Sequence, residues 1–211
     1  MTIPIIHQVH TLKDHLLDEP RPEHLVRFSA RPSGDEGVLV LMRGIPGSGK
    51  TTVARQLCEH IDSLCLDVLY LSADDYWRVH HGDASLYYFD PEIHTRAHDA
   101  CLGRFLLGEF DSPDVAIVDN TNTRLWECSP YLMLARSRGR KAVSLRMATD
   151  VETCIEREQH GVGPERVRKM HERFEDMPSY LAEEFLITDD LRPAFDQVVR
   201  LAFGSERRHG L

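Results

Sequence analysis

The stretch GIPGSGKT at residues 44–51 constrains the fold more than any other part of this sequence. It fits the pattern G-x-x-x-x-G-K-[ST] and directly follows the apolar run VLVLMR at residues 38–43. A short and almost unbroken apolar run is typical of a strand that is buried on both faces. We expect a helix to follow at about residues 50–61. Strand, glycine-rich turn and helix in this order predict a phosphate-binding loop in an α/β fold.

The residue types inside this stretch suit a triphosphate. Glycines let backbone N–H groups turn inward around a phosphate, and the start of the following helix adds a partial positive charge. The Lys50 ammonium can reach the β- and γ-phosphates, and the Thr51 hydroxyl can ligate Mg²⁺. The predicted nucleotide-binding residues are Gly44, Pro46, Gly47, Ser48, Gly49, Lys50, Thr51 and Thr52.

Apolar runs alternate with helical patterns along the rest of the chain. We expect strands at residues 66–71, 114–120 and 141–148, and an edge strand at residues 197–203. Helices are expected at residues 91–110, 123–139 (in two pieces around Pro130), 151–159 and 164–177. The alternation predicts a three-layer α/β fold around a mainly parallel sheet. The predicted domain covers residues 37–211, with residues 1–36 as an N-terminal arm.

Length and charge narrow the class of protein. A chain of 211 residues is long enough for one domain with a sizeable core. The formal net charge of −9 argues against a broad basic surface for long duplex nucleic acid, although the local clusters RSRGRK (136–141) and ERVRKMHER (165–173) could hold a strand end or one nucleotide. The sequence shows neither a run long enough to span a membrane nor a secretory signal, so we expect a cytoplasmic protein.

Carboxylates follow two of the expected strands. Asp74 and Asp75 lie in SADDYW after residues 66–71, and Asp119 ends the apolar run DVAIV. Because ligands of doubly wound sheets bind where parallel strands end, these acids should converge on Lys50. A carboxylate opposite the γ-phosphate can take the proton of an attacking hydroxyl. The residue types alone leave open whether Asp74 or Asp75 would do so.

Four blocks in order carry a resemblance to known proteins. They are RGIPGSGKTT, LSADDYW, VDNTNTRLWE and CIEREQHGVGPERVRKMHERFE. Together they resemble the phage-type polynucleotide 5′-kinases, and resemble even more the kinase-like domain of vertebrate ubiquitin-ligase-binding proteins. The resemblance covers about residues 38–177. It implies a P-loop NTPase fold of the kinase type with a helical lid at about residues 151–177.

The resemblance also implies roles for single residues. The general base of the family falls on Asp74, which leaves Asp75 as a partner within the site. Asp119 would join Thr51 as a ligand of Mg²⁺ or of its water. Arg157 matches the lid arginine that contacts the transferring phosphoryl group, and fixed positive charge suits that position.

One position departs from the family. The polynucleotide kinases carry an arginine three residues after the base, where this chain has Trp77, and Arg78 comes one position late. A tryptophan suits stacking on a base better than binding a phosphate. The predicted substrate-binding residues are Asp75, Trp77, Arg78, Asn120 and Asn122.

Histidines and glycines complete the candidate features. His94 and His98 are spaced i, i+4, but HTRAH lacks the glutamate of HExxH, so we interpret them as a solvated or packing pair. His160 precedes the glycine-rich hinge of the lid and is a weaker candidate for a substrate contact. Gly161 and Gly163 predict a lid that closes and excludes water.

The sequence therefore predicts a P-loop kinase that uses ATP and Mg²⁺ to phosphorylate a hydroxyl of a nucleic acid or nucleotide. The 5′-hydroxyl of a polynucleotide is the first candidate acceptor. Three alternatives stay open. They are a kinase for hydroxymethyl groups on DNA bases, a kinase for nucleosides or other small molecules, and a nucleotide-binding adaptor without catalysis.

Overall fold

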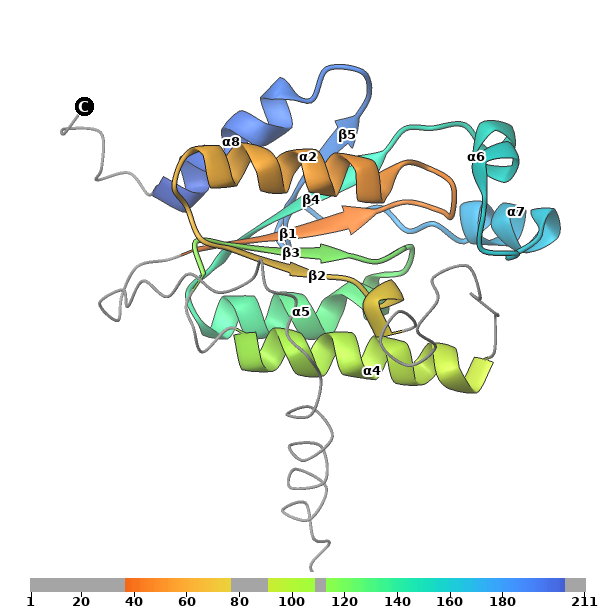
Figure 1. Ribbon diagram of the computed structural model, residues 1–211, viewed down its shortest axis with the longest axis horizontal. Helices are drawn as coiled ribbons and strands as arrows, with labels where there is room; N and C mark the ends of the chain where they lie inside the picture. Colours follow the sequence, from red (N-terminus) through yellow and green to blue (C-terminus); the bar gives the residue numbers. More distant parts are fainter. Residues whose placement is uncertain (1–36, 77–90, 109–112, 204–211) are drawn as a thin grey trace, which may run out of the picture.

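Five parallel strands form the centre of the molecule (Figure 1). The computed structural model describes residues 37–76, 91–108 and 113–203, and the predicted arm at residues 1–36 lies outside them. The strand order is β2-β3-β1-β4-β5, and each neighbouring pair is parallel, so the sheet of the described residues is all-parallel rather than mainly parallel. The strands are β1 (Val38–Arg43), β2 (Val68–Leu71), β3 (Val115–Asp119), β4 (Lys141–Met147) and β5 (Glu183–Ile187).

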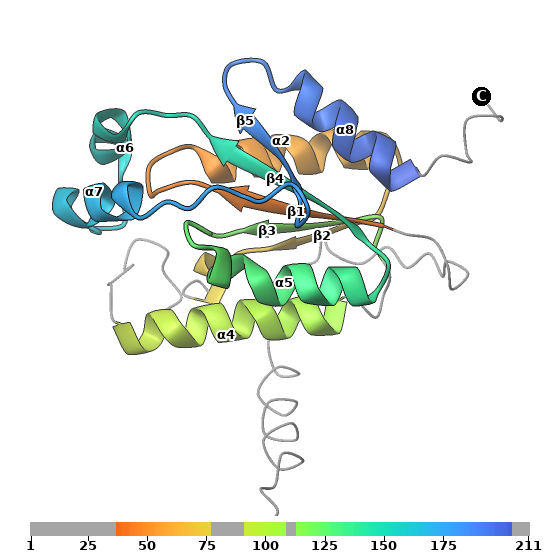
Figure 2. The same ribbon diagram turned by 180° about the vertical axis from the view of Figure 1, so that it is seen from behind.

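Helices cover both faces of the sheet, which confirms the predicted α/β fold (Figures 1 and 2). On one face lie α2 (Lys50–Ser63) and α8 (Arg192–Phe203), and on the other α4 (Pro91–Gly108) and α5 (Leu125–Ser137). Each face of the sheet packs against its helices in a core of its own. β1 is a continuous apolar run because its side chains alternate between the two cores: Val40 packs on the side of α2 and α8, and Leu41 on the side of α4 and α5. The helices α6 (Val151–Arg157) and α7 (Pro164–Glu172), which fall in the region predicted as a lid, lie together beyond the carboxyl end of the sheet (Figure 1).

The C-terminal elements differ from the prediction. Residues 197–203, expected as an edge strand, belong to α8, and the edge strand is β5. Phe195, Val198 and Ala202 repeat at helical spacing and pack into the core beside α2. β-branched valines in a short apolar run fit either structure, so packing against α2 decides for the helix.

The expected break in the helix around Pro130 is also absent from the described structure. α5 runs through Pro130 as one helix of 13 residues. Packing of the buried Cys128 and Leu132 against the sheet holds the turns on both sides of the proline. No helix of the described residues is long and apolar enough to cross a membrane.

Candidate active site

The phosphate-binding loop connects β1 to α2 at the carboxyl end of the sheet. Gly47 and Gly49 have φ values of 78° and 89°, in the left-handed region that favours glycine. A Cβ atom on Gly47 would overlap the backbone carbonyl of Cys154 in α6, so the loop and the lid touch here. Ile45 packs with Cys154 and with Val167 of α7. The lid is therefore built directly on the loop.

The start of α2 offers backbone donors to an anion. Gly49 is the N-cap residue, and no side chain of the described residues caps this helix end. The first N–H groups of a helix lack partners inside the helix and bind phosphate readily. Ser48 Oγ points into the same region, is buried, and has no hydrogen-bond partner among the described residues. Both features suit a bound phosphate.

The ammonium group of Lys50 is hydrogen-bonded to the backbone of the phosphate-binding loop. Its Nζ donates to the backbone carbonyl of Ile45 at 3.0 Å. Burial lowers the pKa of Lys50, and the carboxylates of Asp119 and Asp74 oppose this. The structure thus brings together three of the predicted site residues, from α2, the end of β3 and the turn after β2.

The two carboxylate oxygens of Asp119 differ in their hydrogen bonding within the described structure. Its Oδ2 accepts a 2.7 Å hydrogen bond from the Tyr70 hydroxyl. Burial and the adjacent Asp119 carboxylate raise the pKa of Tyr70, so the phenol stays a donor. Oδ1 is buried and has no partner among the described residues. A buried carboxylate oxygen without a partner among the described residues fits a hard cation such as Mg²⁺, which takes few protein oxygens and keeps water and phosphate ligands.

Asp74 begins a single helical turn that is bonded to the end of β3. Its backbone N–H donates to Ser72 Oγ at 3.2 Å, and that hydroxyl donates to the Asp119 carbonyl at 3.1 Å. Burial raises the pKa of Asp74, whereas His160 and Lys50 lower it. Asp74 therefore combines a fixed backbone with a carboxyl group that holds its proton more strongly than an ordinary aspartate does.

Asp75 belongs to a different set of contacts. Its Oδ2 accepts from Arg104 Nη1 of α4 at 3.3 Å, and both side chains are about one-fifth exposed. The adjacent acids thus differ in environment. Asp74 interacts with Lys50 and Asp119 at the loop, and Asp75 ties the turn to α4.

The two predicted asparagines are buried and bonded within the protein. Asn120 Oδ1 accepts from the Ala73 N–H at 2.9 Å, which fixes the turn before Asp74. Asn122, at φ 45°, donates from Nδ2 to the Met42 carbonyl at 2.9 Å. These contacts hold the ends of β1, β2 and β3 in place, so the geometry favours a positioning role over direct contact with substrate. Trp77 and Arg78 lie outside the described residues.

Arg157 is the last residue of α6 and is exposed. Within the described parts of the chain, no ion pair holds its guanidinium. Gly161 and Gly163 follow, with φ values of 71° and 79° and open space around them. Both glycines adopt left-handed conformations that other residues rarely take. The predicted closing motion of this segment stays a prediction.

Arg43 is a site residue that the sequence did not reveal. It ends β1, is fully buried, and donates to the Glu175 carbonyl at 2.6 Å and to Glu184 of β5 at 2.7 Å. The Phe174 ring, just after α7, contacts the guanidinium groups of Arg43 and Arg146, 4.8 and 4.4 Å from its centroid. Arg43 therefore holds the segment after α7 against the end of β1. The sequence hints at this role only through a charged residue at the end of an apolar strand.

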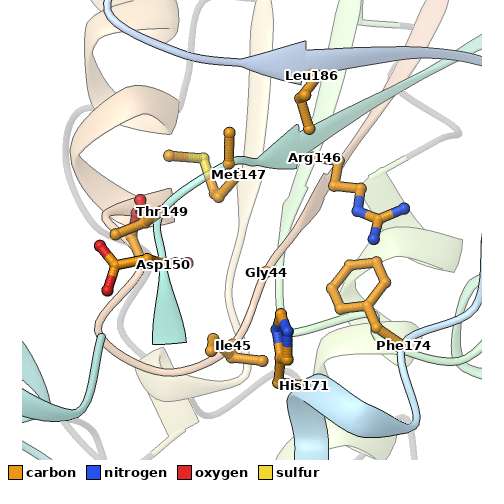
Figure 3. Close-up of a pocket in the computed structure, with 11 residues that line it drawn as sticks. Gly44, Ile45, Arg146, Met147, Thr149, Asp150, His171, Phe174 and Leu186 are labelled. Carbon is orange, nitrogen blue, oxygen red and sulfur yellow. Dashed lines mark hydrogen bonds between the residues drawn. The ribbon is translucent and has the colours of Figure 1, made fainter. Parts of the chain in front are cut away.

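A cavity of about 440 Å³ adjoins the loop on the side of β4 and β5 (Figure 3). Gly44 and Ser48 belong to both the loop and the cavity wall. His171 of α7, Phe174 just after it and Leu186 of β5 also line the cavity, as Figure 3 shows. A volume of this size accommodates a nucleoside-sized group. Because Asp74 and Asp119 follow β2 and β3, the cavity and these acids flank the loop from opposite sides.

Comparison with known proteins assigns the family. Residues 39–183 match the family described as AAA domain. The chain belongs to this AAA domain family. The match confirms the resemblance to P-loop kinase-like domains that the four sequence blocks carry.

Individual relatives of this AAA domain are distant. Human NEDD4-binding protein 2 is 28% identical over 175 residues, which is 81% of this chain and 9% of the relative. Human YLP motif-containing protein 1 is 24% identical over 185 residues, which is 77% of this chain and 9% of the relative. The chain thus spans less than a tenth of the length of these curated relatives.

Solved structures share the fold. Kti12 from Chaetomium thermophilum, in complex with ADP-AlF3, has a TM-score of 0.58 at 21% identity, covering 79% of this chain and 100% of that one. The APS kinase CysC from Mycobacterium tuberculosis, in complex with AMPPNP and APS, has a TM-score of 0.55 at 15% identity, covering 80% and 99%. A putative kinase from Chloroflexus aurantiacus has a TM-score of 0.58 at 16% identity, covering 78% and 98%. At these identities the likeness concerns the fold alone.

Proposed function

We propose that this AAA domain is an ATP- and Mg²⁺-dependent kinase that phosphorylates a hydroxyl of a nucleic acid or nucleotide, with the 5′-hydroxyl of a polynucleotide as the first candidate. The observation that carries the proposal is the meeting of Lys50, Asp74 and Asp119 at the phosphate-binding loop. A protein that only binds a nucleotide needs the phosphate-binding loop and Lys50. Transfer to a hydroxyl also needs a group that accepts the proton of that hydroxyl, and the half-buried Asp74 carboxylate, in addition to Asp119, can serve as this group.

In the proposed reaction Asp74 is the general base. The acceptor oxygen forms a bond to the γ-phosphorus while the bond from that phosphorus to the β,γ-bridging oxygen breaks, and ADP leaves. The hydroxyl proton passes to the Asp74 carboxylate. Burial raises the pKa of Asp74, which makes its carboxylate a stronger base than that of an exposed aspartate. Lys50 and the N–H groups at the start of α2 stabilise the charge on the phosphoryl oxygens.

Asp119 and Thr51 are the residues that would hold Mg²⁺. The unpaired Oδ1 of Asp119 supports this, because a buried carboxylate oxygen without a partner is costly unless a ligand satisfies it. Bound Mg²⁺ would neutralise charge on the β- and γ-phosphates. Tyr70 keeps the Asp119 carboxylate in one orientation through Oδ2.

The lid would complete the site when it closes. Arg157 is exposed at the end of α6, close in sequence to Gly161 and Gly163. In this proposal its guanidinium contacts the transferring phosphoryl group once the lid moves. A guanidinium presents fixed positive charge in a planar fork that matches phosphoryl oxygens. Closure would also exclude water, which competes with the acceptor hydroxyl.

A panel of acceptors tests the proposal. The full chain would be incubated with γ-labelled ATP and Mg²⁺, together with 5′-hydroxyl oligonucleotides, oligonucleotides with hydroxymethylated bases, and free nucleosides. Label on the 5′-hydroxyl oligonucleotides is the expected result. Label on only one of the other two acceptor classes would show that this class, and not the 5′-hydroxyl of a polynucleotide, is the acceptor. ATP binding without transfer to any of the three classes would indicate a nucleotide-binding adaptor instead of a kinase.

A further inference from the structure

A groove with a volume of about 340 Å³ lies between the C-terminal half of α5 and the segment that leads into β5. We call it the α5 groove. Its lining includes Lys141 and Glu183, the first residues of β4 and β5, so it lies at the amino end of the parallel sheet. The phosphate-binding loop follows β1 at the carboxyl end, and the cavity beside that loop shares no lining residue with the α5 groove. The groove is therefore separate from the candidate active site.

Large apolar side chains are exposed in the groove and along α5. Met133 and Tyr180 both line the groove and are 73% and 75% exposed. The turn that carries Tyr180 is held by a hydrogen bond from the Leu181 N–H to the Pro178 carbonyl at 2.9 Å. Trp126, in the first turn of α5, is 70% exposed and precedes Met133 by two helical turns, so both lie on one face of the helix. Such a band of exposed apolar side chains is typical of a binding surface.

The basic cluster RSRGRK of the sequence is placed at this groove. Arg136 and Lys141 line it and are exposed, and no ion pair among the described residues holds either of them. Arg140 also lines it, and its Nη1 donates to the Pro113 carbonyl at 2.7 Å, which fixes the guanidinium and leaves its charge in place. Glu183 is the acidic residue of the described lining. Positive charge thus prevails in the groove of a protein with a net charge of −9, which favours an anionic ligand.

Basic and aromatic side chains together suit a single-stranded nucleic acid. Its phosphates match guanidinium and ammonium groups, and its unpaired bases offer flat faces on which aromatic rings stack. α5 has 13 residues and is therefore about 20 Å long, which corresponds to roughly six nucleotides of a stacked strand. Figure 2 shows that α5 runs from the carboxyl end of the strands back to their amino end. A strand along α5 would therefore lead from the groove to the edge of the sheet where Asp74 and Asp119 lie.

We propose that the α5 groove, together with the face of α5 that carries Trp126 and Met133, binds a single-stranded segment of the acceptor nucleic acid. Arg136 and Lys141 contact its phosphates, and Tyr180 stacks on a base. The inference rests on the proposed kinase function and makes it more specific. The acceptor is then a strand of about six or more nucleotides rather than a free nucleotide.

The test measures binding of nucleic acid without ATP. Fluorescence anisotropy with a labelled thymidine dinucleotide and an oligothymidylate dodecamer would compare the wild type, the double variant Arg136→Gln/Lys141→Gln, and Tyr180→Ala. Arg192→Gln is the matched control, because Arg192 is exposed at the start of α8, on the other face of the sheet, and pairs with Asp190 at 3.1 Å. Tyr180→Phe keeps an aromatic ring and should bind as the wild type does.

The expected changes differ between the variants. The wild type should bind the dodecamer at least about tenfold more tightly than the dinucleotide, because only the dodecamer reaches along the groove. The double variant should weaken dodecamer binding about tenfold and lower the slope of log Kd against log salt concentration by about 1.4, since each phosphate contact on a single strand contributes about 0.7. Tyr180→Ala should weaken it about fivefold or more through the loss of stacking. Arg192→Gln should stay within about twofold of the wild type.

The outcomes keep the two proposals apart because binding is measured without transfer. Length-dependent binding that the groove variants weaken, in a protein that transfers no phosphate, would support the groove and reject the kinase function. Transfer to oligonucleotides, with equal dodecamer binding by the wild type and the groove variants, would overturn the groove alone. An equal loss in Arg192→Gln would also overturn it, as a general effect of charge. If the wild type binds no dodecamer at low salt, the proposal is wrong, and self-association that Tyr180→Ala abolishes, or binding of polyglutamate, would assign the groove to a second copy or to an acidic protein segment.

Discussion

The hydrogen bond from Tyr70 to Asp119 makes a quantitative prediction. Tyr70→Phe removes the 2.7 Å bond to Oδ2 of a carboxylate that is 4% exposed and already has an unpaired Oδ1. A hydrogen bond to a charged group contributes about 1.5–3 kcal/mol, and little water reaches Asp119 to replace the phenol. We therefore expect a loss of about 2 kcal/mol in the free energy of unfolding. For a domain of this size that corresponds to a fall of roughly 4–8 °C in Tm.

The assay is urea and thermal unfolding of the wild type, Tyr70→Phe and Tyr180→Phe. Tyr180 is 75% exposed and serves as the control for loss of a phenol hydroxyl. The variant Tyr70→Phe should also need about tenfold more Mg²⁺ for half-maximal nucleotide binding, because groups that orient a metal ligand affect metal affinity by this order. A loss of stability equal to that of Tyr180→Phe, with unchanged Mg²⁺ dependence, would refute the reasoning on Asp119.

Two further predictions concern the lid and the base. Arg157→Gln should lower kcat about 100-fold while KM for ATP changes less than threefold, which steady-state kinetics at saturating acceptor would measure, because the guanidinium is expected to act in the transition state. Asp74→Asn should raise Tm at neutral pH, because a buried aspartate with a raised pKa is destabilising when ionised. The gain should shrink as the pH falls through the raised pKa, since Asp74 is then protonated in the folded wild type. A variant with the wild-type Tm throughout pH 4–8 would contradict the burial of this carboxylate.

The parts of the fold that depend on local signals could be predicted from the sequence. The boundaries of β1 match the apolar run, and α2 begins at Lys50 as expected. The meeting of Lys50, Asp74 and Asp119 follows from topology, because parallel strands deliver their following residues to one edge. Their catalytic roles stay predictions.

The features that depend on distant contacts could not be predicted. The valines of residues 197–203 suit a strand or a helix, and only packing beside α2 makes them part of α8. Arg43 looks like an ordinary strand end until Glu175 and Glu184, more than 130 positions later, supply its partners.

Single-turnover phosphoryl transfer by Asp74→Asn, with Asp75→Asn as its neighbour control, tests the central claim most directly. ATP affinity, measured by calorimetry, should stay within about threefold of the wild type in both variants, since neither acid belongs to the phosphate-binding loop. Asp74→Asn should abolish transfer, and Asp75→Asn, which loses the ion pair with Arg104, should retain much of it. Transfer at the wild-type rate by Asp74→Asn, or its loss only in Asp75→Asn, would contradict the account.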